Sequence, residues 1–163
     1  MLTRVAAGLY CVLVSHLLTA HALTLQDLQG DAQLTPARLM GYFSDFKFQL
    51  GSNLQKPEEF LARQCGDCDD FANLTALVLK AKGYTPRVFV VFMEGATHVV
   101  CFVAETHSYL DYNHRRDRVL VPSTGTLADV AQKVATSFKS RWYSVSEVTF
   151  SEGVRRFVRT EFP

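Results

Sequence analysis

The segment 63–74, RQCGDCDDFANL, crowds three aspartates around the second of two cysteines. A cysteine thiolate is a strong nucleophile toward carbonyl carbon, and it needs a neighbouring base to take and return protons. Cys68 is expected in the first turn of a helix, where unpaired backbone N–H groups and the helix dipole favour a negative charge. The pattern therefore makes Cys68 a candidate nucleophile.

A candidate base and its orienting carboxylate lie on two later strands. His98 begins an apolar strand, and Asp111 lies in the strand that follows. If a two-residue turn at 105–106 joins these strands, His98 lies opposite Asn113, and Asp111 is its diagonal neighbour, about 7–8 Å away on the same face. This geometry permits a Cys-His-Asp triad, in which the carboxylate orients the imidazole. Taken singly, the three residues also fit a buried cysteine, a strand-end histidine and a turn aspartate.

The elements that must position these residues are helices followed by strands. Thr35 and Pro36 favour a helix start, and Gly51 and Gly83 favour helix ends. Expected helices span residues 36–50, 57–61, 68–82 and 127–138, and expected strands span residues 87–93, 97–104, 108–112 and 142–150. Helices followed by an antiparallel sheet indicate the α+β class.

Composition describes an ordinary globular domain. The chain has 163 residues, which is enough for one domain with a core and too few for two. Its formal net charge is +1 and 48% of its residues are hydrophobic, which is not typical of a disordered chain. Lysines and arginines are scattered along the sequence, so there is no electrostatic case for a nucleic-acid partner.

The first 22 residues differ from the rest of the chain. Arg4 precedes a short apolar run that ends in AHA, the A-x-A form of a secretory cleavage site. The run is shorter than the roughly 20 residues of a membrane-spanning helix. We therefore predict a signal peptide at 1–22 and one domain at 23–163. The mature protein is expected to be exported, periplasmic or secreted, and free of the membrane.

Cleavage of the signal peptide removes Cys11 and leaves three cysteines, an odd number. In an oxidising compartment cysteines usually pair, so one thiol is left over. We interpret Cys68 as the free thiol. Cys65 and Cys101 are then either a disulfide or two buried thiols.

Two other cysteine chemistries fit the same residues. Cys65 and Cys68 form a C-x-x-C at a helix start, as in thioredoxin-like redox motifs, but a helix rather than a strand is expected before them. Together with His98 and Cys101 they also form a C-x-x-C…H-x-x-C zinc set. Residues three apart on a strand point to opposite faces, so an extended strand would keep His98 and Cys101 apart.

Three motifs carry the candidate residues, namely GDCDDFA at 66–72, HVVCFV at 98–103 and LDYN at 110–113. Together, over about residues 57–113, they resemble the transglutaminase-like superfamily of cysteine enzymes, in particular the bacterial transglutaminase-like cysteine proteinases. The resemblance implies a papain-like α+β fold, with Cys68 as nucleophile, His98 as base and acid, and Asp111 as the residue that orients His98. The chain departs from the subgroup at Asp69, where glutamate is frequent, and at Tyr112, which interrupts the usual LDN.

The same resemblance implies a calcium site. Some members of the subgroup bind calcium through acidic residues beside the catalytic cysteine, which here are Asp67 and Asp69. Carboxylates close to Cys68 disfavour ionisation of its thiol, and a bound calcium ion would neutralise their charge. Calcium takes about six to eight oxygen ligands, and these two residues would supply only some of them. The alternative is that Asp67 caps the helix while Asp69 and Asp70 complement its dipole in solvent.

The sequence thus predicts an exported cysteine hydrolase, a peptidase or amidase that acts through a thioester. Its expected substrate is a protein, a peptide or a cell-wall peptide. The chemistry itself requires no cofactor, and calcium is the candidate bound ion. If an amine resolves the thioester, the same site performs transglutaminase-type transfer. A non-catalytic binding domain of the same fold is the remaining alternative.

Overall fold

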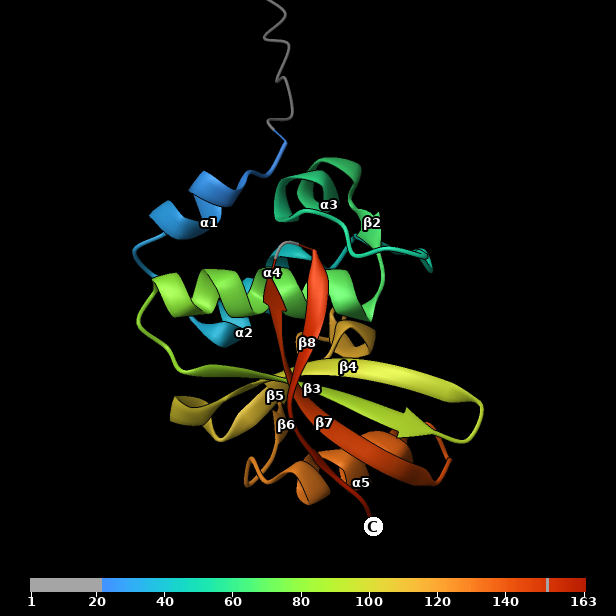
Figure 1. The fold of residues 1–163 in the computed structure, drawn as a ribbon. Coiled ribbons are helices and arrows are strands. Elements are labelled where there is room, and N and C mark those ends of the chain that lie inside the picture. Colours follow the sequence, from blue (N-terminus) through green and yellow to red (C-terminus); the bar gives the residue numbers. More distant parts are fainter. Residues whose placement is uncertain (1–21, 152) are drawn as a thin grey trace, which may run out of the picture.

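The computed structural model describes residues 22–151 and 153–163, and its central feature is a six-stranded antiparallel sheet (Figure 1). The strand order is β6-β5-β4-β3-β7-β8. The strands are β3 (Pro86–Met93), β4 (Ala96–Val103), β5 (Ser108–Leu110), β6 (Val121–Pro122), β7 (Trp142–Ser151) and β8 (Val154–Glu161). A separate parallel pair joins β1 (Lys47–Phe48) to β2 (Cys65–Gly66).

Helices cover both faces of the sheet. The long helix α4 (Cys68–Ala81) packs on β3 and β4, whereas α5 (Leu127–Ser137) packs on β3 and β7 (Figure 1). The remaining helices are α1 (Leu25–Gly30), α2 (Pro36–Tyr42) and α3 (Pro57–Arg63), with the 3-10 turns η1 (Ala104–Thr106) and η2 (Tyr112–His114). Both α1 and α3 contact α4. This arrangement confirms the predicted α+β class with helices packed on an antiparallel sheet.

The central strands are apolar on both faces because each face contacts a different helix. One set of strand residues packs with Ala72 of α4 and consists of Val88, Val90, Val99, Cys101 and Val148. The alternating set packs with α5 and consists of Phe89, Val91, Val100, Phe102 and Val145. Burial on both faces explains why these strands are nearly continuous apolar runs in the sequence.

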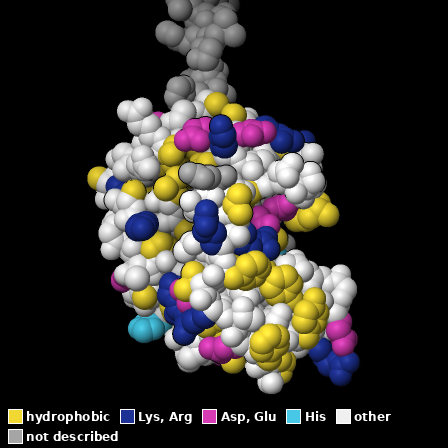
Figure 2. Space-filling view, viewed as in Figure 1, with side chains coloured by type: hydrophobic (Ala, Val, Ile, Leu, Met, Phe, Trp, Pro, Cys, Tyr) yellow, Lys and Arg dark blue, Asp and Glu magenta, His cyan; other side chains and the backbone are white. Residues whose placement is uncertain are grey.

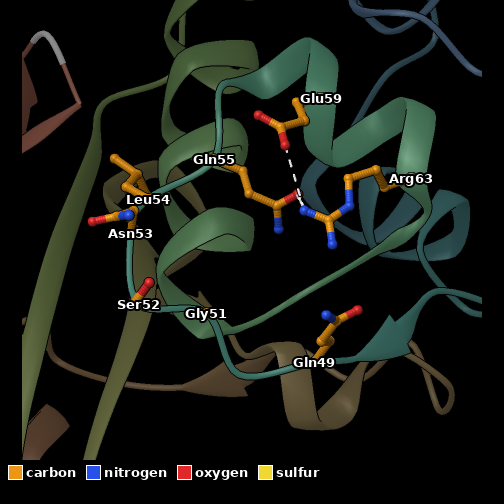
Figure 3. Close-up of a pocket in the computed structure, with 8 residues that line it drawn as sticks. All are labelled: Gln49, Gly51, Ser52, Asn53, Leu54, Gln55, Glu59 and Arg63. Carbon is orange, nitrogen blue, oxygen red and sulfur yellow. Dashed lines mark hydrogen bonds and ion pairs between the residues drawn. The ribbon is translucent and has the colours of Figure 1, made fainter.

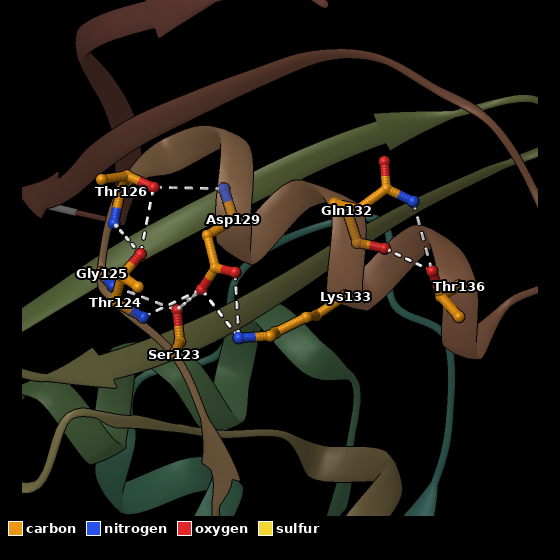
Figure 4. Close-up of polar contacts among 8 residues, drawn as sticks. All are labelled: Ser123, Thr124, Gly125, Thr126, Asp129, Gln132, Lys133 and Thr136. Atoms are coloured by element: carbon orange, nitrogen blue, oxygen red, sulfur yellow. Dashed lines mark hydrogen bonds and ion pairs between the residues drawn. The ribbon is translucent and has the colours of Figure 1, made fainter.

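A polar network fixes the start of α5 (Figure 4). Thr126 caps the helix by accepting the N–H of Asp129, and the Asp129 carboxylate accepts hydrogen bonds from Ser123 and Lys133. Burial opposes ionisation of Asp129, but these donors outweigh it and lower its pKa to about 2. The helix is thereby anchored to the loop that precedes it.

The helix predicted at 36–50 is wrong beyond α2, which ends at Tyr42. Phe43 and Phe46 continue the helical spacing of apolar residues, but they enter the core from a turn. The chain then extends into β1, which pairs with β2 and so leads into the loop before α3. Backbone pairing with a distant segment, which local spacing does not reveal, has replaced the last turns of the helix.

Two strand predictions also need correction. The strand predicted at 142–150 is not the last one, because β8 follows it after a turn containing Gly153. The strand predicted at 108–112 ends at Leu110, where Asp111 leaves the sheet and caps η2. The elements α1, β1, β2 and β6 were not predicted.

Within the described residues, no helix combines the length and apolar character that crossing a membrane requires. The predicted signal peptide at 1–22 lies outside the described residues except for Ala22. Cleavage, export and the domain start at residue 23 therefore stay predictions.

Candidate active site

Cys68 is the first residue of α4, as the sequence predicts. Its side chain is partly buried and packs against the apolar residues between α4 and the sheet. Asp67 caps the helix, and its Oδ1 accepts the N–H groups of Asp69 and Asp70. The N–H of Cys68 is not among the groups that Asp67 accepts. The helix start therefore offers Cys68 both a favourable dipole and a backbone donor of its own.

His98 and Asp111 form a buried pair beside Cys68. His98 Nε2 and Asp111 Oδ1 are 2.8 Å apart, and the two side chains are 5% and 2% exposed. Asp111 Oδ1 also accepts the N–H of Asn113 at 2.8 Å, which fixes the carboxylate. The Cys68 side chain lies close enough to His98 to help raise the pKa of its imidazole. Because Nε2 faces Asp111, Nδ1 is the ring nitrogen left for the sulfur.

The β4–β5 register explains how His98 meets Asp111. The pairs Cys101–Leu110, Phe102–Tyr109 and Val103–Ser108 are those that a turn at 105–106 predicts. The ladder stops at Leu110, before the predicted pairing of His98 with Asn113. Asp111 lies just beyond that end, so its side chain reaches back to the imidazole. The predicted register is confirmed, although the paired stretch is shorter than expected.

The pair is charged at neutral pH. Burial opposes protonation of His98, but hydrogen bonds and charge interactions with Asp111 and Cys68 outweigh it and raise the pKa of His98 to about 10. Burial likewise opposes ionisation of Asp111, but the contact with His98 outweighs it and lowers the pKa of that carboxyl. His98 therefore carries a proton that it can donate to a leaving group.

The loop at 49–55 holds the start of α4 in place. Asp67 Oδ2 accepts the N–H of Gly51 at 3.0 Å. The two oxygens of Asp70 accept the backbone N–H and the side-chain amide of Gln55, each at 2.7 Å. Asp70 also closes a capping box by accepting the N–H of Asp67. Asp67 thus caps the helix, as the alternative predicts, whereas Asp70 is buried and does not lie in solvent as that alternative expects.

The same loop lines a pocket of about 340 Å³, which it shares with α3 (Figure 3). In the pocket, Arg63 of α3 donates to Gln55 Oε1 at 3.2 Å and pairs with Glu59 at 3.4 Å. The lining residues do not include Cys68 or His98, so this pocket is separate from their contact. It borders the loop that supports the helix start.

The surface is indented on the side where α4 begins. Figure 2, in the same view as Figure 1, shows this indentation at the right, between the helical layer and the sheet. Hydrophobic side chains cover much of the surface below it, and acidic and basic side chains are interspersed elsewhere on this face.

The residues predicted to bind calcium, Asp67 and Asp69, have other partners in this arrangement. Both oxygens of Asp67 accept backbone N–H groups, from Asp69, Asp70 and Gly51. Asp69 Oδ2 pairs with Arg155 of β8, and its buried Oδ1 has no hydrogen-bond partner. Among the described residues, no three acidic, histidine or cysteine side chains are placed to share a metal ion. One unengaged oxygen does not fit an ion that takes about six to eight.

The three described cysteines are all free thiols. The disulfide considered between Cys65 and Cys101 is therefore not formed. Cys101 lies in the core, where burial raises its pKa far above the ordinary value of a thiol. Cys65 and Cys68 are likewise not joined as a redox disulfide, and the set with His98 forms no metal site among the described residues.

Two residues near the candidate site were missed from the sequence, Gln55 and Arg155. Gln55 contacts Asp70 from an irregular loop that has no motif. Arg155 lies 86 positions from Asp69, on a strand that the sequence did not reveal. The arginine-rich stretch at 155–159 is the one available signal, because arginines in a strand often pair with buried carboxylates.

Comparisons with known proteins agree with this picture at the level of the family. A family model described as a transglutaminase-like domain matches residues 19–114, more than half of the chain. The calcium-bound structure of LapG from Legionella pneumophila matches with 15% identity and a TM-score of 0.48, covering 76% of this chain and 67% of LapG. A likeness of that size carries no functional argument. A search among curated proteins gives no match.

Proposed function

This chain belongs to the transglutaminase-like domain family, and from that membership we propose that it is a cysteine hydrolase that cleaves amide bonds. The observation that carries the proposal is the contact chain from Cys68 through His98 to Asp111. The link between His98 and Asp111 is 2.8 Å long and buried. Cys68, at the N-terminus of α4, is near enough to His98 to raise its pKa. Nucleophile, base and orienting group are the parts that covalent acyl transfer requires.

In the first half of the reaction, the Cys68 thiolate attacks the carbonyl carbon of an amide and forms a tetrahedral intermediate. The backbone N–H of Cys68 is positioned as a donor to the developing oxyanion. The carbon–nitrogen bond then breaks as the His98 imidazolium gives its proton to the leaving amine. The products of this half are a free amine, a Cys68 thioester and a neutral His98.

In the second half, water resolves the thioester. Neutral His98 takes a proton from the attacking water while Asp111 holds the ring in place. The carbon–sulfur bond breaks, the carboxylic acid leaves, and the thiolate and imidazolium are restored. If an amine attacks instead of water, the same steps give transglutaminase-type transfer.

We further propose that the substrate is a peptide segment in a protein or in the cell wall, met outside the cytoplasm. The predicted signal peptide at 1–22 supports export. A short domain has few loops for selecting a substrate, so an exposed and extended substrate segment fits it best. The chemistry is proposed to proceed without a required cofactor.

Alkylation by iodoacetamide at pH 6–9 tests the activated thiol. We expect Cys68 to react at least about tenfold faster than Cys65 at pH 6, because only a thiolate reacts and His98 stabilises it. Cys101 is the internal control and should stay unlabelled in the native protein. Mass spectrometry of proteolytic fragments measures all three sites in one sample.

Two variants and one substrate assay complete the test. His98→Gln should slow the labelling of Cys68 without changing that of Cys65. Cleavage of casein should be lost in Cys68→Ser, while incorporation of dansylcadaverine into casein would identify amine transfer. Equal and slow labelling of Cys65 and Cys68 in the native protein would refute the proposed function.

A further inference from the structure

An ion pair joins the first turn of α4 to the last strand of the sheet. Arg155 Nη2, at the start of β8, donates to Asp69 Oδ2. Both side chains are partly buried, at 26% and 28% exposure, so solvent screens their charges less than on an open surface. Asp69 directly follows Cys68, and the pair therefore lies beside the proposed nucleophile.

Within residues 22–151 and 153–163, the other two aspartates near Cys68 do not have such a partner. Asp67 and Asp70 are held by backbone N–H groups and by the amide of Gln55, which are neutral donors. Neutral donors satisfy the carboxylate oxygens but leave the net negative charge in place. Among the described residues, Arg155 is the cation that forms an ion pair with this aspartate group.

The charges around Asp69 oppose one another. Burial raises the pKa of Asp69, and the carboxylates of Asp67 and Asp70 raise it further. The Arg155 guanidinium lowers it, but the net effect is a raised pKa. An uncompensated aspartate at this position would repel a thiolate at Cys68. A cation that pairs with Asp69 therefore favours the anionic form of Cys68, in addition to the charge of His98.

We propose that Arg155 is the fixed cation that cancels the charge of Asp69 beside Cys68, in the place where a calcium ion was expected, so that the thiolate requires no metal. The inference rests on the proposed function of Cys68. It makes Arg155 a positioning residue, since it acts through Asp69 and does not contact the thiol in any described interaction.

The test compares alkylation rates of Cys68 at one pH, 7.0, in the full chain with and without EDTA. We expect the native rate to be the same under both conditions. Arg155→Gln should slow the reaction by about tenfold, because a unit charge is lost within a partly buried group. Arg155→Lys should retain most of the native rate, since it keeps the charge.

A double variant separates charge from structure. If Arg155 acts by neutralising Asp69, then Asp69→Asn combined with Arg155→Gln should recover a rate close to that of the native protein. A double variant as slow as Arg155→Gln alone would overturn the inference. Arg159→Gln is the matched control, because Arg159 lies on the same strand but pairs with Glu147.

The remaining outcomes distinguish the two proposals. If native Cys68 reacts selectively but EDTA slows it, the fixed-cation inference fails and the cysteine hydrolase stands. If native Cys68 shows no selective reaction in either condition, the proposed function itself fails. Melting temperatures of all variants establish that the compared proteins are folded.

Discussion

At the scale of single residues, the environment of His98 decides the chemistry. An isolated histidine is mostly neutral at pH 7, but Asp111 and Cys68 keep this one protonated despite its burial. In the proposed reaction, the proton is then available to the leaving amine without an earlier transfer from the thiol. The same interactions that prepare the reaction also link the stability of the fold to pH.

We predict that the Asp111 contact stabilises the fold most near and below neutral pH, over the range in which Asp111 stays ionised. The pKa of His98 is about 10 in the folded protein against an ordinary 6.5, so the folded state binds the proton more tightly. The contribution is fully present below pH 6.5 and is lost as the pH rises through 10. Urea unfolding of the native protein and Asp111→Asn at pH 6, 8 and 10 measures it.

The difference in unfolding free energy between the two proteins should shrink steadily over this range. His107→Asn, at an exposed histidine, is the control and should show no such trend. A difference that stays constant from pH 6 to pH 10 would mean that His98 is not protonated by its contact with Asp111.

At the scale of elements, the start of α4 depends on close packing with the loop at 49–55. Gly66 precedes the cap, and a Cβ there would collide with the carboxylate of Asp70 and lie 2.7 Å from the Gln55 amide and the Phe60 ring. Only glycine lets the loop, β2 and the helix start approach one another this closely.

We predict that Gly66→Ala destabilises the protein. Overpacking of this kind costs about 1–3 kcal/mol, which corresponds to a melting temperature lower by about 2–10 °C. Gly30→Ala is the matched control, because a Cβ at Gly30 meets nothing within 4 Å. Calorimetry measures both melting temperatures. If they were the same, the side chains around Gly66 would accommodate a Cβ without loss of stability.

Which elements could be predicted from the sequence follows from how each one is stabilised. The helix at Cys68 and the β4–β5 register were predicted because caps, apolar spacing and a short turn are local signals. β8 was missed because most of its residues are exposed on both faces, and such a strand leaves no alternation. Arg155 was missed along with its strand, so the partner of Asp69 could not be predicted.

At the scale of the whole molecule, one buried arginine joins the segment between β5 and β6 to the N-terminal layer. Arg115 donates to the carbonyl oxygens of Phe46 at 2.8 Å and Tyr112 at 2.9 Å, and its guanidinium lies 4.2 Å from the centre of the Tyr112 ring. Tyr112 directly follows Asp111. The position of the orienting carboxylate therefore depends on how the two parts of the molecule are joined.

We predict that Arg115→Lys lowers the free energy of unfolding by about 1.5–3 kcal/mol, because an ammonium group cannot reproduce the forked donors or the stacking. Arg116→Lys, at an exposed neighbour, should change it by less than about 0.5 kcal/mol. Urea unfolding of both variants measures the effect. If Arg115→Lys were as stable as Arg116→Lys, residues other than Arg115 would stabilise the contact between the two parts of the molecule.

The ion pair between Asp69 and Arg155 also has a consequence for the timing of biosynthesis. The ribosome adds the arginine 86 residues after the aspartate, which takes roughly 4–17 s at usual elongation rates. During this interval a nascent chain contains the sulfur and its acidic neighbours but lacks the compensating charge. Our inference implies that Cys68 reaches its full reactivity only after β8 has been synthesised and Arg155 has paired with Asp69.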